Sequence, residues 1–183
     1  MRYRYFVRRV LGPVVGPFVL FVLKRMSTYR TVLGVDLWLA ADTVDRSLLF
    51  DRITDALHLV EQWDKPRFTR IQRYLGSIVI LEGTEASHLP SLRICVLGAI
   101  TVLDGPVARL AATLVHEATH ARIRTAGVPL RLATIAREEV LCSEESIRCL
   151  QRLPGGEYEA NRRRQILDTE LKKERPWFYA TFH

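Results

Sequence analysis

Apolar and polar side chains follow two different periods along the chain, and the change from one to the other divides the chain into two parts. Strict alternation within residues 31–41 predicts a strand with three apolar side chains on one side: Val35, Leu37 and Leu39. Residues 77–81 (SIVIL) and 92–97 (LRICVL) are short apolar runs, each typical of a strand. Residues 100–103 are interpreted as a continuation of the last run.

Helical spacing, with apolar residues three or four positions apart, marks five other segments. Two of them lie among the strands: a helix over residues 47–64 ends before Pro66, and a short helix over residues 67–74 ends at Gly76. Residues 83–90 are expected to be a loop. The remaining three helices follow one another in the second part of the chain: residues 107–124, 130–153 and 158–174.

The sequence therefore predicts an α+β fold in which a small mixed sheet comes first and three helices follow, the last of them at the C-terminus. A length of 183 residues is typical of one domain. We assign this domain to residues 31–183 and treat residues 1–30 as a separate segment, because the charge and hydropathy of the two parts differ.

Basic residues are concentrated at the N-terminus. The chain has 27 Lys and Arg against 20 Asp and Glu, a formal net charge of +7. Residues 1–30 carry seven basic side chains and no acidic one, so residues 31–183 are neutral overall. Nucleic-acid-binding proteins carry basic residues over their folded surface. We therefore do not expect a nucleic-acid partner.

Residues 10–23 form an uncharged apolar stretch between the basic residues of this N-terminal segment. As a helix the stretch would be about 21 Å long, shorter than the ~30 Å hydrocarbon core of a bilayer. Arg9 and Lys24 flank it and can extend towards the headgroups. We expect residues 1–30 to associate with membrane lipid, either across a thin bilayer or in its interface; the alternative is a buried N-terminal helix.

The three cysteines do not suggest disulfides. Cys142 and Cys149 are seven residues apart on one expected helix, about 10 Å from each other and too far to bridge. Together with Cys95 they are expected to be buried free thiols, typical of a reducing compartment. We therefore expect the domain on the cytoplasmic side of the membrane, although the N-terminal arginines are also compatible with the opposite orientation.

The expected helix over residues 107–124 contains the sequence His116-Glu117-Ala118-Thr119-His120. Two histidines four residues apart lie on one helix face, so both imidazoles can reach one metal ion. Glu117 is rotated by about 100° from His116 and can act as the general base for a water on that metal. The other histidines, including His88 in the expected loop, are given no role.

A catalytic zinc site needs a third protein ligand, and the next helix offers two neighbouring glutamates. Glu139 shares its side of the helix with small and apolar residues, and a carboxylate pointing at the core requires a cation. Glu138 shares its side with charged residues and is expected to be solvated. The alternative for Glu139 is a core carboxylate paired with an arginine.

At this point the chain resembles the gluzincin zinc metallopeptidases, which pair this motif with a glutamate on the following helix. Eighteen residues separate His120 from Glu139 here, a spacing common in those families, and the order of elements is similar to the compact minigluzincin type. The resemblance covers roughly residues 75–155. It implies that His116, His120 and Glu139 bind Zn²⁺, that Glu117 is the catalytic base, and that residues 92–97 form the edge strand that aligns a peptide.

The chain departs from the gluzincin pattern at two points. Ser143 stands where many gluzincins have an Asp that supports a zinc-bound histidine, and Glu144 is next to it. No residue is marked by its position as the group that stabilises the oxyanion; Tyr158 and Arg124 are the candidates.

The sequence thus predicts a membrane-associated zinc metallopeptidase acting on a peptide or protein substrate. Two alternatives stay open. One is a zinc-binding regulator or scaffold without turnover. The other is a membrane-associated protein in which the motif is coincidental and its histidines are satisfied by core hydrogen bonds.

Overall fold

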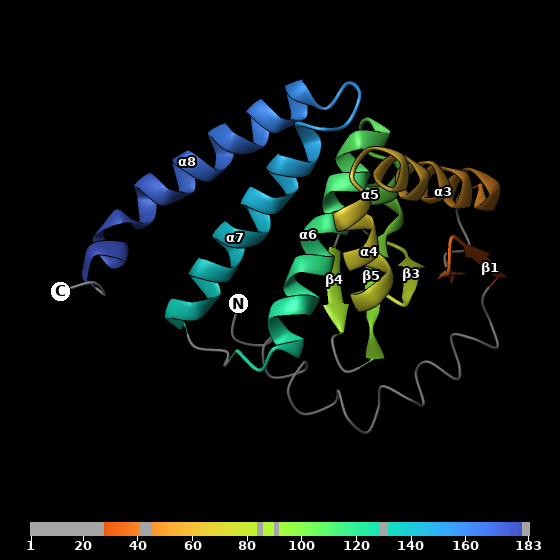
Figure 1. The fold of residues 1–183 in the computed structure, drawn as a ribbon, viewed down its shortest axis with the longest axis horizontal. Helices are drawn as coiled ribbons and strands as arrows, with labels where there is room; N and C mark the ends of the chain where they lie inside the picture. The colour runs from red at the N-terminus through yellow and green to blue at the C-terminus, as the bar shows by residue number, and fades with distance from the viewer. Residues whose placement is uncertain (1–27, 41–44, 84–85, 90–91, 129–131, 181–183) are drawn as a thin grey trace.

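The computed structural model describes residues 28–40, 45–83, 86–89, 92–128 and 132–180. The expected α+β class is confirmed: within these residues a five-stranded mixed sheet is followed by a helical part (Figure 1). None of the helices in this part of the chain is both long and apolar enough to cross a bilayer. The stretch of residues 10–23, for which we expected lipid contact, lies outside the described residues.

The sheet begins with a hairpin where one strand was expected. Strands β1 (Thr28–Val32) and β2 (Val35–Leu39) pair antiparallel across a turn at Leu33 and Gly34, whose φ angles are 50° and 78°. Two consecutive positive φ values are typical of a two-residue hairpin turn. The alternation in residues 31–41 therefore belongs mainly to β2, and β1 begins three residues before the domain boundary that we expected.

Strand order in the sheet is β1-β2-β3-β5-β4, with β3 at Ser77–Leu81, β4 at Ala86–Leu89 and β5 at Ile94–Gly98. The β2–β3 and β3–β5 pairs are parallel, whereas β4 runs antiparallel to β5. Two predictions are wrong here. Residues 83–90 contain β4 rather than only a loop, and the run at 92–97 becomes β5, an interior strand, so the edge next to it is β4.

A third prediction fails just after β5. Residues 99–103 form the short helix α5 (Ala99–Leu103) and do not continue the strand. Its buried side chains, Ala99 and Val102, are three residues apart, a helical spacing. The β-branched composition of this stretch favoured a strand, but packing against α3 decides the conformation.

Five further helices complete the fold. They are α3 (Arg46–Trp63), α4 (Lys65–Tyr74), α6 (Val107–Thr125), α7 (Leu132–Leu150) and α8 (Glu157–Ala180). The bounds lie within three residues of the expected ones, except that α8 ends six residues beyond position 174. Asp45 caps α3 by accepting hydrogen bonds from the backbone N–H groups of Ser47 and Leu48 at 3.0 and 3.3 Å. The start of α3 is therefore set by a local sequence signal.

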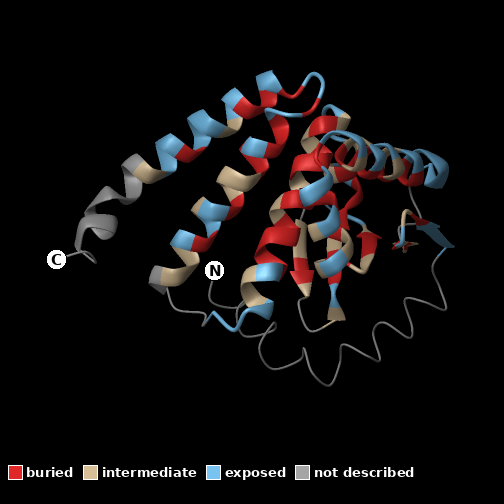
Figure 2. Cartoon of the chain, viewed as in Figure 1, coloured by how far each residue is buried: buried red, intermediate tan, exposed pale blue. Residues whose placement is uncertain are grey.

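Helix α6 is the central helix of the fold. It packs against α3, α4, β4 and β5 on the sheet side and against α7 on the other side (Figure 1). Most of its middle is buried, as Figure 2 shows. Helix α8 lies outside α7. The three cysteines, Cys95, Cys142 and Cys149, are free and buried, which confirms the expected thiols.

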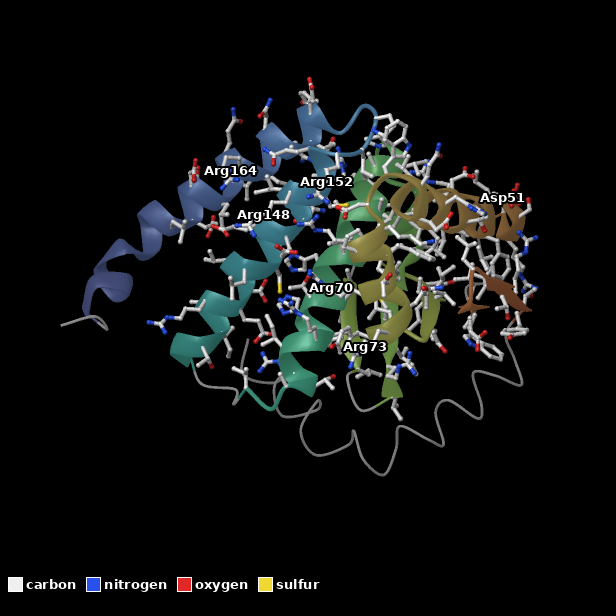
Figure 3. The ribbon with its side chains drawn as sticks, in the orientation of Figure 1. Asp51, Arg70, Arg73, Arg148, Arg152 and Arg164 are labelled. Carbon is white, nitrogen blue, oxygen red and sulfur yellow. The ribbon has the colours of Figure 1, made fainter. Side chains whose placement is uncertain are left out.

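A network of charged side chains fixes α4 and α7 against α6. Arg70 of α4, labelled in Figure 3, donates to Glu145 Oε2 of α7 at 2.7 Å and to Thr119 Oγ1 of α6 at 3.2 Å. Buried Asp64, between α3 and α4, accepts from Arg67 at 2.6 Å and from Arg152 at 3.2 Å. The relative placement of α6 and α7, which carry the residues of interest, is therefore set by paired charges as well as by apolar packing.

A second charged contact connects α8 to α6 and carries a prediction. Arg109 donates from Nε and Nη2 to both carboxylate oxygens of Glu159, at 3.0 and 2.8 Å, and Glu159 is 2% exposed. We expect Glu159→Gln to lower the free energy of unfolding by about 2–4 kcal/mol at pH 7, because it leaves the guanidinium without its buried partner. Urea denaturation measures this change, and Glu157→Gln, at an exposed position in the same first turn, should change it little.

The same contact has a pH signature. The hydrogen bonds from Arg109 hold the pKa of Glu159 below its ordinary value of 4.5. A carboxyl whose pKa is lowered on folding contributes its stability above the pKa of the unfolded chain and loses it as pH falls through the folded pKa. The difference between wild type and Glu159→Gln should therefore shrink below about pH 4.5. A difference that is the same at pH 3 and pH 7 would show that the ion pair is not its source.

Candidate metal centre

Two histidines one turn apart on α6 form the base of the candidate site. The Nε2 atoms of His116 and His120 lie 3.0 Å apart, and the two rings meet edge to face with centroids 4.7 Å apart. The side chain of His116 is 18% exposed and that of His120 is 8% exposed. The helix therefore presents both Nε2 atoms to one point, close to the surface.

Helix α7 brings Glu139 to that point. Its carboxylate oxygens lie 3.5 Å from His116 Nε2 and 3.3 Å from His120 Nε2. One ligand atom from each of the three side chains lies within 4.8 Å of the others. The structure thus groups the three residues that we expected to be metal ligands, and no other such group of His, Cys, Asp and Glu occurs in the part of the chain that it describes.

The burial of the two neighbouring glutamates is the reverse of the expected one. Glu138 is 2% exposed, whereas the side chain of Glu139 is 56% exposed. Cys142, Ser146 and Cys149 are buried on α7. Glu138 precedes Cys142 by four residues and Glu139 precedes it by three, and both spacings fit one helix face. Periodicity therefore does not distinguish the two glutamates.

Glu138 has a different place in the site. Its Oε1 accepts from His120 Nδ1 at 2.7 Å, and its Oε2 forms a close ion pair with Arg124 on the last turn of α6. The core carboxylate paired with an arginine, which we considered for Glu139, is thus Glu138. A carboxylate on the far nitrogen of a histidine fixes the ring orientation and leaves Nε2 for a metal.

The Nδ1 atom of His116 differs from that of His120. Among the described residues, His116 Nδ1 is buried and has no hydrogen-bond partner. Ser143, four residues beyond Glu139, therefore does not supply one. The two histidines therefore differ at Nδ1: that of His120 has a charged partner, and that of His116 has none among the described residues.

Contacts within the site raise the pKa of His120 and lower the pKa of Glu139. Burial disfavours a charged His120, but the contacts with Cys142 and Glu139 outweigh that effect and raise the pKa of His120. Hydrogen bonds from His116 and His120 hold the pKa of Glu139 well below its ordinary value. A metal ion at this point would replace a proton as the partner of Glu139 and the two rings.

Glu117 directly follows His116 on α6 and is 6% exposed. Burial raises the pKa of this carboxyl, but the hydrogen bond with His88 and the nearby rings of His116 and His120 outweigh burial, so its pKa is lowered. Glu117 is therefore a carboxylate at neutral pH and can accept a proton. This is the protonation state that a general base requires.

Sequence reasoning missed His88. It is on β4 rather than in a loop, is 8% exposed, and its Nδ1 lies 3.3 Å from Glu117 Oε2. Its ring stacks on that of His120, with centroids 5.2 Å apart and an interplanar angle of 10°. Nothing in the sequence around His88 marks it, because β4 is a four-residue strand with a single buried side chain.

The structure does not assign the oxyanion-stabilising role to either candidate residue. Arg124 is paired with Glu138 inside the site. Tyr158 is 74% exposed in the first turn of α8. Neither arrangement assigns the role.

The donor set fits zinc. A tetrahedral zinc ion with bonds of about 2.0–2.2 Å holds its ligand atoms roughly 3.3–3.6 Å apart. The two Nε2 atoms lie 3.0 Å apart here, and each lies 3.3–3.5 Å from a different carboxylate oxygen of Glu139. Two imidazoles and one carboxylate are a ligand set that catalytic zinc sites use. The half-exposed Glu139 places the site at the surface, where a water or a substrate can approach.

Compared with protein-family models, with characterised proteins and with solved structures, the chain matches none. Any function proposed for it therefore rests on the geometry described above and on the patterns of its sequence.

Proposed function

We propose that the chain is a zinc-dependent peptidase in which His116, His120 and Glu139 hold the metal and Glu117 is the general base. The observation that carries this proposal is the convergence of three ligand atoms within 4.8 Å beside a buried carboxylate of lowered pKa. The resemblance of residues 75–155 to gluzincin metallopeptidases supports the same assignment, since this ligand order is theirs.

Zinc bound by these three side chains would lower the pKa of a coordinated water and polarise the peptide carbonyl. The residues of the chain have separate tasks around it. Glu138 keeps Nε2 of His120 pointed at the ligand position through its hydrogen bond to Nδ1. Glu117 accepts the proton of the attacking water at one carboxylate oxygen and then donates it to the leaving amine.

The substrate is proposed to be a polypeptide in an extended conformation. Strand β4 is the last strand of the sheet, and its residue His88 contacts Glu117 of the site. An extended peptide can pair with such an edge through main-chain hydrogen bonds. This would place one of its carbonyls near the three ligands. Strand β4 thus takes the peptide-aligning role expected of residues 92–97, which form an interior strand.

Association with membrane lipid through residues 1–30 is part of the same proposal. The reason is the charge pattern of that segment: seven basic side chains flank an uncharged stretch and no acidic side chain is present. An N-terminal lipid contact would restrict the peptidase to substrates at the membrane surface.

Metal removal and reconstitution test the proposal. The full-length chain is purified, assayed on a fluorescent peptide library, stripped with a chelator and reloaded with zinc. We expect about one zinc per chain, cleavage that disappears with the metal, and cleavage that returns when zinc is added back. Zinc binding without cleavage in any state would support a regulator or scaffold instead. No zinc binding would mean that the motif is coincidental.

A further inference from the structure

His88 occupies a position that the proposed ligand set and base do not use. It comes from β4, whereas His116, Glu117 and His120 all come from α6. Strand β4 packs against α6, and the His88 side chain is 9% exposed in that contact. It is therefore a histidine delivered to the site by a separate element of the fold, at the edge of the sheet.

The contact between His88 and Glu117 has a defined direction. An ionised carboxylate only accepts hydrogen bonds, so the atom that meets Glu117 Oε2 at 3.3 Å, His88 Nδ1, is the one that carries the proton. A donor–acceptor distance of 3.3 Å is longer than most charge-assisted bonds, and contacts of this kind shorten when a catalytic site closes on its substrate.

Ring stacking fixes the position of that donor. The His88 ring lies parallel to the ring of His120, with centroids 5.2 Å apart. His120 is in turn held by Glu138 at 2.7 Å. The Nδ1 atom of His88 is thus located by a strand on one side and by an oriented ring on the other. It can in turn hold the end of a Glu side chain, which has three rotatable bonds of its own.

We propose that His88 is a positioning residue, which holds Oε2 of Glu117 so that Oε1 faces the attacking water; the inference rests on the proposed peptidase function. His88 acts through Glu117 in this account and touches neither the metal nor the substrate. Because β4 is also the proposed peptide edge, the base and the substrate would be placed by the same strand.

Two substitutions separate the donor from the ring. His88→Phe keeps a ring to stack on His120 and removes the donor, whereas His88→Asn keeps an N–H near the position of Nδ1 and removes the ring. We expect His88→Phe to lower kcat at least tenfold with zinc content and KM unchanged, and His88→Asn to restore most of kcat. His58→Phe is the matched control, because it makes the same change at an exposed histidine of α3.

Three kinetic outcomes would overturn the inference. A wild-type kcat in His88→Phe would mean that the donor is unimportant. A loss of kcat in His88→Asn as large as that in His88→Phe would mean that the Nδ1 donor alone does not carry the effect. An increase in KM with kcat unchanged would mean that His88 contacts the substrate.

A second readout does not depend on turnover. Long-range ¹H–¹⁵N spectra of the full-length chain, with and without zinc, report which ring nitrogen of His88 is protonated. We expect the Nδ1–H tautomer in the wild type and its loss in Glu117→Ala. The Nε2–H tautomer in the wild type would overturn the inference even in an active enzyme. A wild type that cleaves no peptide but shows the Nδ1–H tautomer would defeat the proposed function while supporting the hold of His88 on Glu117.

Discussion

Replacing Glu117 with Gln is expected to lower kcat for peptide hydrolysis by a factor of about 10²–10⁴ while zinc content stays at one per chain. Gln has the shape of Glu and can still bond to His88, but it cannot accept a proton. The hydrogen bond with His88 and the nearby rings of His116 and His120 lower the pKa of Glu117, so its side chain is ionised at neutral pH and the substitution removes the proposed base.

Steady-state kinetics on a cleaved peptide, with zinc measured in the same preparation, checks this result. The melting temperature of the metal-free variant serves as the control for folding, since Glu117 is buried. If kcat were unchanged, Glu117 would not be the base. If zinc were lost together with activity, Glu117 would belong to the ligand set and the assignment of roles would be wrong.

The second large effect concerns the two neighbouring glutamates of α7. Glu139→Ala is expected to weaken zinc binding more than 100-fold, because it removes a ligand. Glu138→Gln is expected to weaken it by about 10–100-fold, the usual cost of removing the partner of a metal-bound histidine. The reason for this order is geometric: Glu139 faces both Nε2 atoms, whereas Glu138 bonds to His120 Nδ1.

Competition with a fluorescent zinc chelator measures both affinities. Glu144→Ala is the matched control, because Glu144 is on the same helix and its described ion pair is with Arg148. It should leave zinc affinity unchanged. The reverse order, with Glu138→Gln more damaging than Glu139→Ala, would make Glu138 the ligand and contradict the account of the site.

The part of the site that sequence predicts well is the part carried by one helix. His116, Glu117 and His120 are neighbours in sequence, and the helical repeat alone determines that the two imidazoles share a face. The grouping of Glu139 with them depended on a spacing between two helices. The structure reproduces this grouping because α6 and α7 pack directly against each other.

The parts that sequence did not predict depend on tertiary packing. Glu138 and Glu139 are both within one turn of Cys142, so the crossing of α7 over α6 and the arginine at position 124 decide which of them is buried. His88 lies in the site because the edge strand β4 brings it there. This strand has only four residues and no apolar alternation that would predict it. The alternation within residues 31–41 predicts one strand, because the hairpin turn at Leu33 and Gly34 interrupts the pattern for only two residues.

The central claim is that two imidazoles and one carboxylate hold a zinc ion, and X-ray absorption at the zinc edge tests it most directly. For the zinc-loaded full-length chain we predict a shell of about four nitrogen and oxygen atoms at about 2.0–2.2 Å, with outer-shell scattering from two imidazole rings. A sulfur at about 2.3 Å would place Cys142, which lies against His120, in the ligand set. That result, a shell without imidazole scattering, or a chain that retains no zinc would contradict the account.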